Sequence, residues 1–464
     1  MNIFKKASVV TFILFCGITG SLVLSSAYPF VFVCVVLMVL NSFSCISIIM
    51  STPIIEGFLN LNLETPIPVE TLVMILLTPI IIWRCILKGP VLYGKALKIY
   101  LAFCLLIIIG TYVALEQRFY TINADTVLTN NFINFFRILF CIGLSYFFVS
   151  LKRKGLLQAF KIVLQLAPWL LIITTLYYLR TSTKIGANAG YLAIGDIKHG
   201  EFSAMIVAFS VFGFYNIYTE KNWLKKLLNI VAIILMGYLI FQLGSKNGLL
   251  GLALVIIFTS YYFFIKGKPF RFAAIVLLMI TVVSIVIANA IDTPTIQRLL
   301  LAQTPQGIDV NKLTTGRAEY WSAGVSTFFS PQGFLGYGSS SLASRWVTGS
   351  AAGAVEENVL HNTPLEFAIQ LGIFGLVLYI IVVSTMMKNF LILWRVVKTN
   401  NLSTILLIPF LCFFSVTISG LFLSWQWQSY WWYQIALIFA IIKLFILPLK
   451  VYKRQPGLLL SGLQ

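Results

Sequence analysis

Apolar stretches of about 20 residues recur from one end of the chain to the other, and a helix of that length spans the hydrocarbon core of a bilayer. The stretches are continuous rather than alternating in polarity, which is typical of membrane helices. Hydrophobic residues make up 59% of the 464 residues and charged residues only 10%, whereas a soluble domain is roughly 45–50% apolar. The sequence therefore predicts an all-α polytopic membrane protein.

The apolar stretches predict about 12–13 transmembrane helices. Residues 7–50 form two apolar segments divided at Ala27–Pro29, and the count stays open because one segment in this region could be re-entrant or interfacial. Lys5 and Lys6 precede the first segment without a clear cleavage site, so we expect a retained anchor rather than a signal peptide. The later helices are expected near 68–87, 98–115, 132–150, 157–177, 200–217, 226–243, 247–265, 272–290, 365–386, 402–422 and 431–450.

The formal net charge of +19 is distributed in short clusters between the predicted helices. The clusters alternate with loops that lack them, which is the positive-inside pattern of a multi-pass protein and not a nucleic-acid-binding surface. Loops 116–131, 178–199 and 291–364 are therefore expected on the outer side. The basic clusters are Arg84/Lys88/Lys95/Lys98, Lys152/Arg153/Lys154, Lys221/Lys225/Lys226, Lys266/Lys268/Arg271, Arg395/Lys398 and Lys450/Lys453/Arg454.

Residues 1–464 are interpreted as a single integral membrane domain, in which the loop 291–364 forms the roof of the functional site. A loop of this length is typical of a functional segment rather than of a passive connector. The seven cysteines all lie in or beside apolar stretches without a CxxC or Cys/His spacing, so we expect no disulfide framework and no zinc site. We expect no other metal and no cofactor either.

The stretch "VEENVLHNTPLEFAIQLGIFG" (355–375) leads from this loop into an apolar helix. "TPLE" predicts the helix start, with Thr363 as N-cap, Pro364 at the first helical position and Glu366 as the capping-box acid. His361 would then lie just before a helix N-terminus, whose free N–H groups and partial positive charge attract anions. A neutral imidazole beside a bound phosphate could act as a general base. The alternative is an interfacial histidine that bonds to a loop carbonyl.

Three further stretches belong to the same side. "TTGRAEYW" (314–321) places Arg317 and Trp321 four residues apart on a short predicted helix. "PQGFLGYGSSS" (331–341) is a glycine-rich turn that allows close backbone approach. "GSKNGLLGLAL" (244–254) places Lys246 at another outward-facing helix N-terminus. Charged residues near the bilayer are costly and tend to mark sites.

These stretches together resemble the O-antigen ligase / O-antigen polymerase superfamily of bacterial envelope enzymes, whose pattern combines a long late periplasmic loop with "GR…W", "GxG" and "HN…LE…G…G" elements. The matching residues are Gly316–Arg317…Trp321, Gly336–Tyr337–Gly338 and His361–Asn362…Leu365–Glu366…Gly372…Gly375. The family's "SRG" element corresponds to Ser245–Lys246–Asn247–Gly248, where lysine replaces arginine and binds phosphate only as a point charge. "GDIKHGEFSAM" (195–205), which contains His199, resembles a further short polar segment of the family.

The resemblance implies glycosyl transfer from an undecaprenyl-pyrophosphate-linked glycan to a sugar hydroxyl, on the periplasmic face of the bacterial inner membrane, without metal or nucleotide sugar. It implies His361 as the base, Arg317 and Arg345 as the pyrophosphate clamp, and Lys246 in support. Arg180 and Lys184 are weaker candidates for the same anion, and His199, Trp321 and Glu366 are further candidate site residues. The implied partners are the lipid-linked donor, the sugar acceptor, membrane lipids and a chain-length regulator, with no nucleic acid.

The activity expected first is polymerisation of lipid-linked repeat units of O-antigen, capsule or exopolysaccharide. The alternative is a ligase that transfers the polymer to lipid A–core or to protein, since only the acceptor differs. A transporter of lipid-linked sugars would instead need charged or broken helices through the midplane. Ordinary ion pairs or solvation for Arg317 and Arg345, a snorkelling Lys246 and a structural His199 also remain open. The run "SWQWQSYWWY" (424–433) is expected to form an interfacial aromatic belt rather than to stack sugars.

Overall fold

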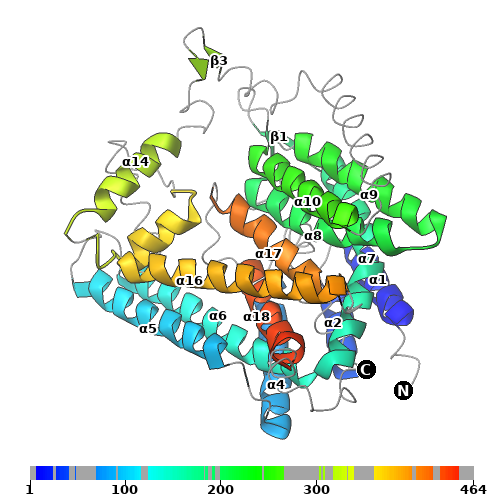
Figure 1. The fold of residues 1–464 in the computed structure, drawn as a ribbon, viewed down its shortest axis with the longest axis horizontal. Coiled ribbons are helices and arrows are strands. Elements are labelled where there is room, and N and C mark those ends of the chain that lie inside the picture. The colour runs from blue at the N-terminus through cyan, green and yellow to red at the C-terminus, as the bar shows by residue number, and fades with distance from the viewer. Residues whose placement is uncertain are drawn as a thin grey trace.

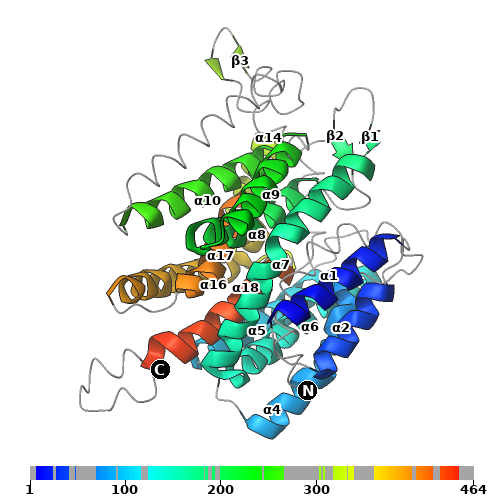
Figure 2. The same ribbon diagram turned by 90° about the vertical axis from the view of Figure 1, so that its right-hand side faces the viewer.

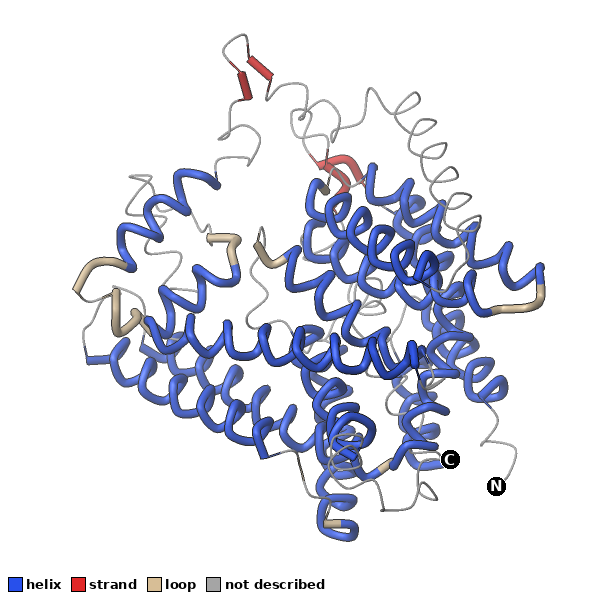
Figure 3. Tube along the Cα trace, viewed as in Figure 1, coloured by secondary structure: helices blue, strands red, loops and turns tan. Residues whose placement is uncertain are grey.

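The chain folds into a bundle of helices, as Figures 1 and 3 show. The computed structural model describes residues 7–23, 28–40, 48, 69–89, 92, 94–116, 124–181, 183–185, 191–193, 199–242, 245–265, 303–304, 307–308, 317–331, 333–338, 360–399, 404–421 and 429–448. Within them, β-structure is confined to the two small antiparallel pairs β1(Thr183–Ile185)–β2(Tyr191–Ala193) and β3(Gln303–Thr304)–β4(Gly307–Ile308). The protein is thus an all-α polytopic membrane protein.

The described helices have the following bounds. They are α1(Ala7–Val23), α2(Tyr28–Leu40), α4(Val69–Lys88), α5(Gly94–Glu116), α6(Ala124–Ser150), α7(Lys152–Thr181), α8(His199–Thr219), α9(Trp223–Gln242), α10(Lys246–Ile265), α14(Arg317–Phe328), α16(Thr363–Thr399), η3(Thr404–Leu407), α17(Ile408–Ser419), α18(Ser429–Ile441) and η4(Ile442–Ile446). Six of them are long and apolar enough to cross a membrane, by length and composition, and six further apolar helices are shorter. The helix expected at 272–290 lies outside the described residues.

Side-chain contacts show which helix ends lie together. Tyr215, near the end of α8, contacts Thr404 at the start of η3, where the two hydroxyl oxygens are 3.2 Å apart. Arg153, at the start of α7, donates through Nε to the carbonyl oxygen of Leu444 in η4 at 2.7 Å. Asn216, near the end of α8, donates to the carbonyl oxygen of Leu164 in the first half of α7 at 2.6 Å. The clusters at Lys152–Lys154 and Lys221–Lys226 therefore lie at one end of the bundle, which we call the basic end. The opposite end, which holds the starts of α8, α10 and α16, is called the motif end.

Helix α1 runs in the same direction as α7. Thr11 lies opposite Gln165, with a 3.2 Å hydrogen bond, and Phe15 lies opposite Trp169, with ring centroids 5.6 Å apart. Helix α1 therefore begins at the basic end. Helix α2 packs antiparallel to it, since the backbone N–H of Phe30 donates to Ser21 Oγ. This arrangement settles the direction of the first helix, for which the sequence pattern gave no answer.

The centre of the bundle is an aromatic core around α18. Trp431 and Trp432 are both fully buried, and their rings lie 5.0 Å apart at an angle of 82°. Trp431 stacks on Phe413 of α17, and Trp432 packs edge-on against Phe103 of α5. The expectation of an interfacial aromatic belt is wrong for the described part of this run, Tyr430–Tyr433, because each of these rings is buried against neighbouring helices.

Helix α16 differs from its prediction in length and continuity. It extends to Thr399, well beyond the expected end near 386, and it is broken at Gly372, where φ is 66° and ψ is −160°. Only glycine adopts such a conformation readily, because it has no Cβ. The sequence pattern predicted a continuous helix here because the apolar residues continue without interruption across Gly372.

Candidate functional site

Helix α14 packs on the start of α16 and forms a second, smaller core with it. Phe328 of α14, Tyr337, Leu360 and Ile369 are buried together there. A Cβ added to Gly324 would lie 2.8 Å from Leu365 Cδ2, so the side chain of Leu365 packs directly on the backbone of α14. The short helix expected around Arg317 and Trp321 is thus confirmed, and it is held against the segment that contains His361.

A hydrogen bond connects the "GR…W" element to the "HN" element. The indole Nε1–H of Trp321 donates to the carbonyl oxygen of Leu360 at 2.9 Å. Leu360 is fully buried and directly precedes His361. A buried carbonyl needs a hydrogen-bond partner, and the indole N–H provides one. Trp321 therefore orients the backbone next to the candidate base.

Asn362, rather than Thr363, caps α16. Its Oδ1 accepts a hydrogen bond from the backbone N–H of Leu365 at 3.0 Å, which is the N-cap geometry. Its Nδ2 donates to the carbonyl oxygen of Leu421 at 3.1 Å and so connects the helix start to the end of α17. The prediction of Thr363 as N-cap is wrong by one residue. The stronger intrinsic preference of asparagine for this position is the signal that could have identified it.

The start of α16 has few N–H groups to offer to an anion. The N–H of Thr363 donates to the carbonyl oxygen of Gly420 at 2.7 Å, and the N–H of Glu366 donates to the carbonyl oxygen of Asn362 at 2.8 Å. Leu365 donates to the cap, and Pro364 has no N–H. The expectation of free N–H groups at this helix start is therefore wrong for residues 363–366. An anion at this helix start would therefore need cationic side chains as its ligands.

Glu366 is fully buried and does not form the predicted capping box. Its Oε1 accepts the N–H of Leu360 at 3.0 Å, and its Oε2 accepts the amide Nε2–H of Gln370 at 2.8 Å. A capping-box glutamate would instead bond to the N–H of the N-cap residue. The carboxylate thus holds the strand of chain that leads to His361. Gln370 was missed by the sequence analysis, although its position four residues after Glu366 places both on one helix face.

His361 has a left-handed backbone conformation, with φ of 52°. Non-glycine residues rarely adopt positive φ, and such outliers concentrate at functional sites. The ring is half-buried, and Nδ1 is buried within the protein. The chain on both sides of His361 is fixed, through Leu360 by Trp321 and Glu366 and through Asn362 by Leu421. The imidazole is therefore held on a rigid segment.

The "GxG" element pairs its backbone with the break in α16. The N–H of Tyr337 donates to the carbonyl oxygen of Ile369 at 2.8 Å, and the N–H of Gly338 donates to that of Gln370 at 3.0 Å. In return, the N–H of Ile373 donates to the carbonyl oxygen of Phe334 at 3.0 Å. The interrupted helix thus exposes backbone groups that the loop satisfies.

Three glycines make this close approach possible. Gly336 and Gly338 have φ of 88° and 105°. A Cβ on Gly336 would lie 2.5 Å from the backbone nitrogen of Gly372, and a Cβ on Gly372 would lie 2.4 Å from the carbonyl oxygen of Phe334. The close backbone approach expected of the glycine-rich turn is confirmed. Its partner, the break at Gly372, could not be recognised without the fold.

Helices α8 and α10 bring two further candidates to the same end. A Cβ on Gly248 would lie 2.8 Å from Ser203 Cβ, and one on Gly251 would lie 3.2 Å from Val207 Cγ1, so the two helices run parallel. Their first residues, His199 and Lys246, therefore both lie at the motif end. Ser245 caps α10, since its Oγ accepts the N–H of Gly248 at 3.0 Å. The predicted position of Lys246 at a helix start is confirmed.

The end of α17 places Lys246 on the same side as His361. Gly251 packs against Ser419, the last residue of α17, with 3.3 Å from a Cβ on Gly251 to Ser419 Oγ. The next residue, Gly420, accepts the N–H of Thr363. Arg180 also lies at the motif end, because it is next to the last residue of α7, which runs antiparallel to α8.

The structure shows the candidate cations in different detail. Arg317 is the first residue of α14 and is half-buried, and this burial lowers the pKa of its guanidinium. Lys184 lies in β1, directly after α7. The side chains of Lys246, His199, Arg180 and Lys184 lie outside the described part of the structure, and so does Arg345 as a whole. The structure therefore places the backbone of Arg317, Lys246, Arg180 and Lys184 and of both histidines at one end, while a shared cavity stays a prediction.

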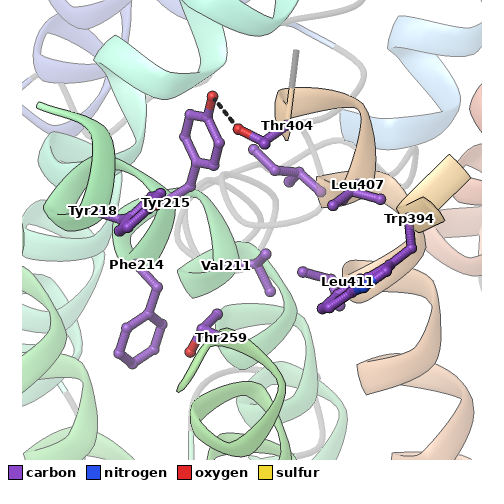
Figure 4. A pocket seen from close by; sticks show the side chains of 10 residues that line it. Val211, Phe214, Tyr215, Tyr218, Thr259, Trp394, Thr404, Leu407 and Leu411 are labelled. Atoms are coloured by element: carbon purple, nitrogen blue, oxygen red, sulfur yellow. Dashed lines mark hydrogen bonds between the residues drawn. The ribbon is translucent and has the colours of Figure 1, made fainter. Parts of the chain in front are cut away.

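A small apolar pocket lies away from these residues (Figure 4). It has a volume of about 30 Å³, enough for about one water molecule. Its walls come from the end of α8, the start of η3 and the late part of α16, for example Tyr215, Thr404 and Trp394. The pocket therefore lies at the basic end and has no part in the site.

Comparison with known proteins agrees with these elements. No curated protein matches the chain. Residues 231–380 match the model of the O-antigen ligase family, a range that contains Lys246, Arg317, the glycine-rich loop and His361. The match supports a function of the ligase or polymerase type in general, and it supports membership of this chain in the O-antigen ligase/polymerase superfamily.

Proposed function

We propose that the protein transfers a glycan from a polyprenyl-pyrophosphate donor to a sugar hydroxyl at the motif end of the bundle. His361 takes the proton of the acceptor hydroxyl, and the oxygen attacks the anomeric carbon of the donor. The bond from that carbon to the pyrophosphate oxygen breaks, and the electron pair leaves with the pyrophosphate. A positioned base contributes roughly 10²–10⁴-fold to such a reaction. The observation that carries the proposal is the rigid hold on His361 from Trp321, Glu366 and Asn362.

Cationic side chains stabilise the leaving pyrophosphate in this proposal. The start of α16 has its N–H groups occupied, so the negative charge needs guanidinium and ammonium groups. Arg317 is the principal one, because its half-buried guanidinium can bind two phosphate oxygens at once. Lys246 supports it as a point charge, and Arg345, Arg180 and Lys184 are further candidates. Since Nδ1 of His361 is buried, Nε2 is the nitrogen that meets the hydroxyl.

Within this reaction class, we propose polymerisation of repeat units. The segment 331–355 is rich in glycine and serine, and Arg345 is its only charged residue, which suits a neutral repeat-unit acceptor. The basic end would face the cytoplasm of the bacterial inner membrane, and the motif end the periplasm. Ligation to lipid A–core or protein is the second candidate, because the matching family model is described as O-antigen ligase.

Deletion of the gene separates the two activities in an organism that decorates lipid A–core. Loss of a polymerase leaves the ligase supplied with single units, so core carrying one repeat is expected, with no longer ladder. Loss of a ligase leaves bare core and long polymer on the lipid carrier. Bare core with accumulated lipid-linked polymer would move the assignment to ligase and would leave the role of His361 unchanged. Unchanged surface glycan and lipid-linked pool would contradict both activities.

A further inference from the structure

A large cleft opens at the basic end, away from the proposed site. It has a volume of about 810 Å³ and lies between α1, α7, the end of α8 and the start of α9. Helix α7 packs against both α1 and α9 (Figure 2). The cleft has two chemically different parts, and the proposed reaction uses neither.

The part nearest the basic end is cationic. Lys161, Lys221 and Lys225 line it together with one acid, Glu220, so its formal charge is +2. Oε1 of Glu220 accepts the backbone N–H groups of Lys221 at 3.0 Å and Asn222 at 3.2 Å. The carboxylate is thereby held by the turn between α8 and α9. The lysine side chains are exposed and present ammonium groups to the cleft.

The amide side chains of the cleft make hydrogen bonds within the protein. Asn216 Nδ2 donates to the carbonyl oxygen of Leu164 at 2.6 Å and to Asn229 Oδ1 at 3.2 Å. Asn229 in turn donates to the carbonyl oxygen of Lys225 at 2.7 Å. Gln165 Oε1 accepts the hydroxyl of Thr11. The lysines are therefore the charged groups that can recognise a ligand, and three ammonium groups recognise an anion.

The other part of the cleft is apolar and aromatic. Phe12, Phe15, Pro168 and Trp169 line it. Phe12 is 67% exposed and Trp169 is 41% exposed. Trp169 lies within the candidate membrane span of α7. Trp169 follows Lys161 by eight residues, which is about 12 Å along a helix. The cleft thus runs from a cationic mouth at the basic end to an apolar wall nearer the middle of the bundle.

We propose that this cleft binds an anionic phospholipid of the leaflet at the basic end. The phosphate would lie among Lys161, Lys221 and Lys225, and one acyl chain would lie along Phe12, Phe15 and Trp169. The cationic and apolar parts of the cleft lie in the same order as the head group and the acyl chains of such a lipid in its leaflet. Basic pockets between membrane helices also favour anionic head groups. A soluble phosphate ion would leave the apolar wall unused. The site is separate from the motif end and does not depend on the proposed reaction.

Photo-crosslinking to the full-length protein in nanodiscs tests this proposal. The nanodiscs contain phosphatidylcholine with a small fraction of either phosphatidylglycerol or phosphatidylcholine that carries a diazirine in the acyl chain. We expect the phosphatidylglycerol probe to label the α1 and α7 peptides that contain Phe12, Phe15 and Trp169, well above the phosphatidylcholine probe. Equal labelling by both probes, or labelling outside these peptides, would overturn the proposal.

Charge variants show whether the lysines are responsible for the labelling by the phosphatidylglycerol probe. Each lysine near an anionic membrane contributes roughly fivefold in affinity, so Lys161→Gln should lower phosphatidylglycerol labelling by about that factor, and the Lys161/Lys221/Lys225→Gln triple variant much more. The matched control is Lys95/Lys98/Lys154→Gln, which removes the same charge from exposed positions at the same end. Wild-type labelling in the single and triple cleft variants, or an equal loss in the control, would contradict a specific site. Loss of labelling in millimolar inorganic phosphate would indicate a free-phosphate site and would also overturn the lipid assignment.

Discussion

The indole Nε1–H of Trp321 donates a 2.9 Å hydrogen bond to the carbonyl oxygen of Leu360, the residue before His361. This bond joins α14, which begins with the candidate pyrophosphate ligand Arg317, to the segment that holds the candidate base. The two elements lie about 40 residues apart in the sequence, so the bond is a tertiary contact. It makes the position of His361 dependent on the packing of α14.

Trp321→Phe tests this dependence. Phenylalanine keeps the aromatic volume but removes the donor, which leaves the buried carbonyl of Leu360 unsatisfied and costs about 1 kcal/mol. We expect glycan transfer to fall by roughly five- to tenfold, because a displaced base loses transition-state stabilisation. The measurement is the rate of product formation by purified protein. Trp223→Phe is the matched control, since Trp223 is exposed at the basic end, and it should be active. Wild-type activity of Trp321→Phe would show that the bond does not position the base.

His361→Asn separates the chemistry of the imidazole from the strain of its backbone. Asparagine tolerates the left-handed conformation of residue 361, whereas alanine does so less readily. Asparagine cannot act as a base, so we expect activity to fall by roughly 10²–10⁴-fold while abundance and membrane insertion stay normal. The readout is the polysaccharide ladder together with the amount of protein in the membrane fraction. Near-normal polysaccharide would exclude His361 as the base.

Gly372→Ala should destroy the pairing between α16 and the glycine-rich loop. The new Cβ would lie 2.4 Å from the carbonyl oxygen of Phe334, in a backbone with φ of 66°. With ψ of −160°, this backbone conformation is essentially restricted to glycine, and it costs a residue with a Cβ roughly 1–3 kcal/mol. We expect a lower Tm and loss of activity. Gly237→Ala is the control, because a Cβ there meets nothing within 4 Å inside α9 and should stabilise the helix by about 0.5–1 kcal/mol. Equal Tm values for the two variants would contradict the packing at Gly372.

Arg317→Lys tests the form of anion binding. Lysine keeps the charge but loses the planar fork that binds two phosphate oxygens, so we expect transfer to fall by roughly tenfold or more. The protein should stay folded, because Arg317 is only half-buried. Arg395→Lys, at an exposed position near the end of α16, should leave the rate unchanged. The transfer rates of the variant and the wild type are compared at saturating and at limiting donor. Equal rates under both conditions would show that Arg317 does not bind the pyrophosphate.

The sequence by itself determined the class of the protein and the side on which its features lie. The length of the apolar stretches requires membrane helices, and the alternation of basic clusters predicts which helix ends lie together. The helix starts at Lys246 and near His361 were also predictable, since serine or asparagine before an apolar run marks an N-terminus. These features depend on neighbouring residues in the chain, which is why the pattern reveals them.

Only the tertiary structure decided how the site is held together. The break at Gly372 exists because the loop at Phe334–Gly338 satisfies the freed backbone groups, and neither segment alone predicts the other. Glu366 holds Leu360 instead of capping its helix, because burial brings the Leu360 N–H within reach of the carboxylate. The aromatic run at Tyr430–Tyr433 is core rather than membrane boundary, because α5, α16 and α17 surround it. Each of these contacts joins residues distant in the sequence, so its energy depends on partners that a local pattern does not specify.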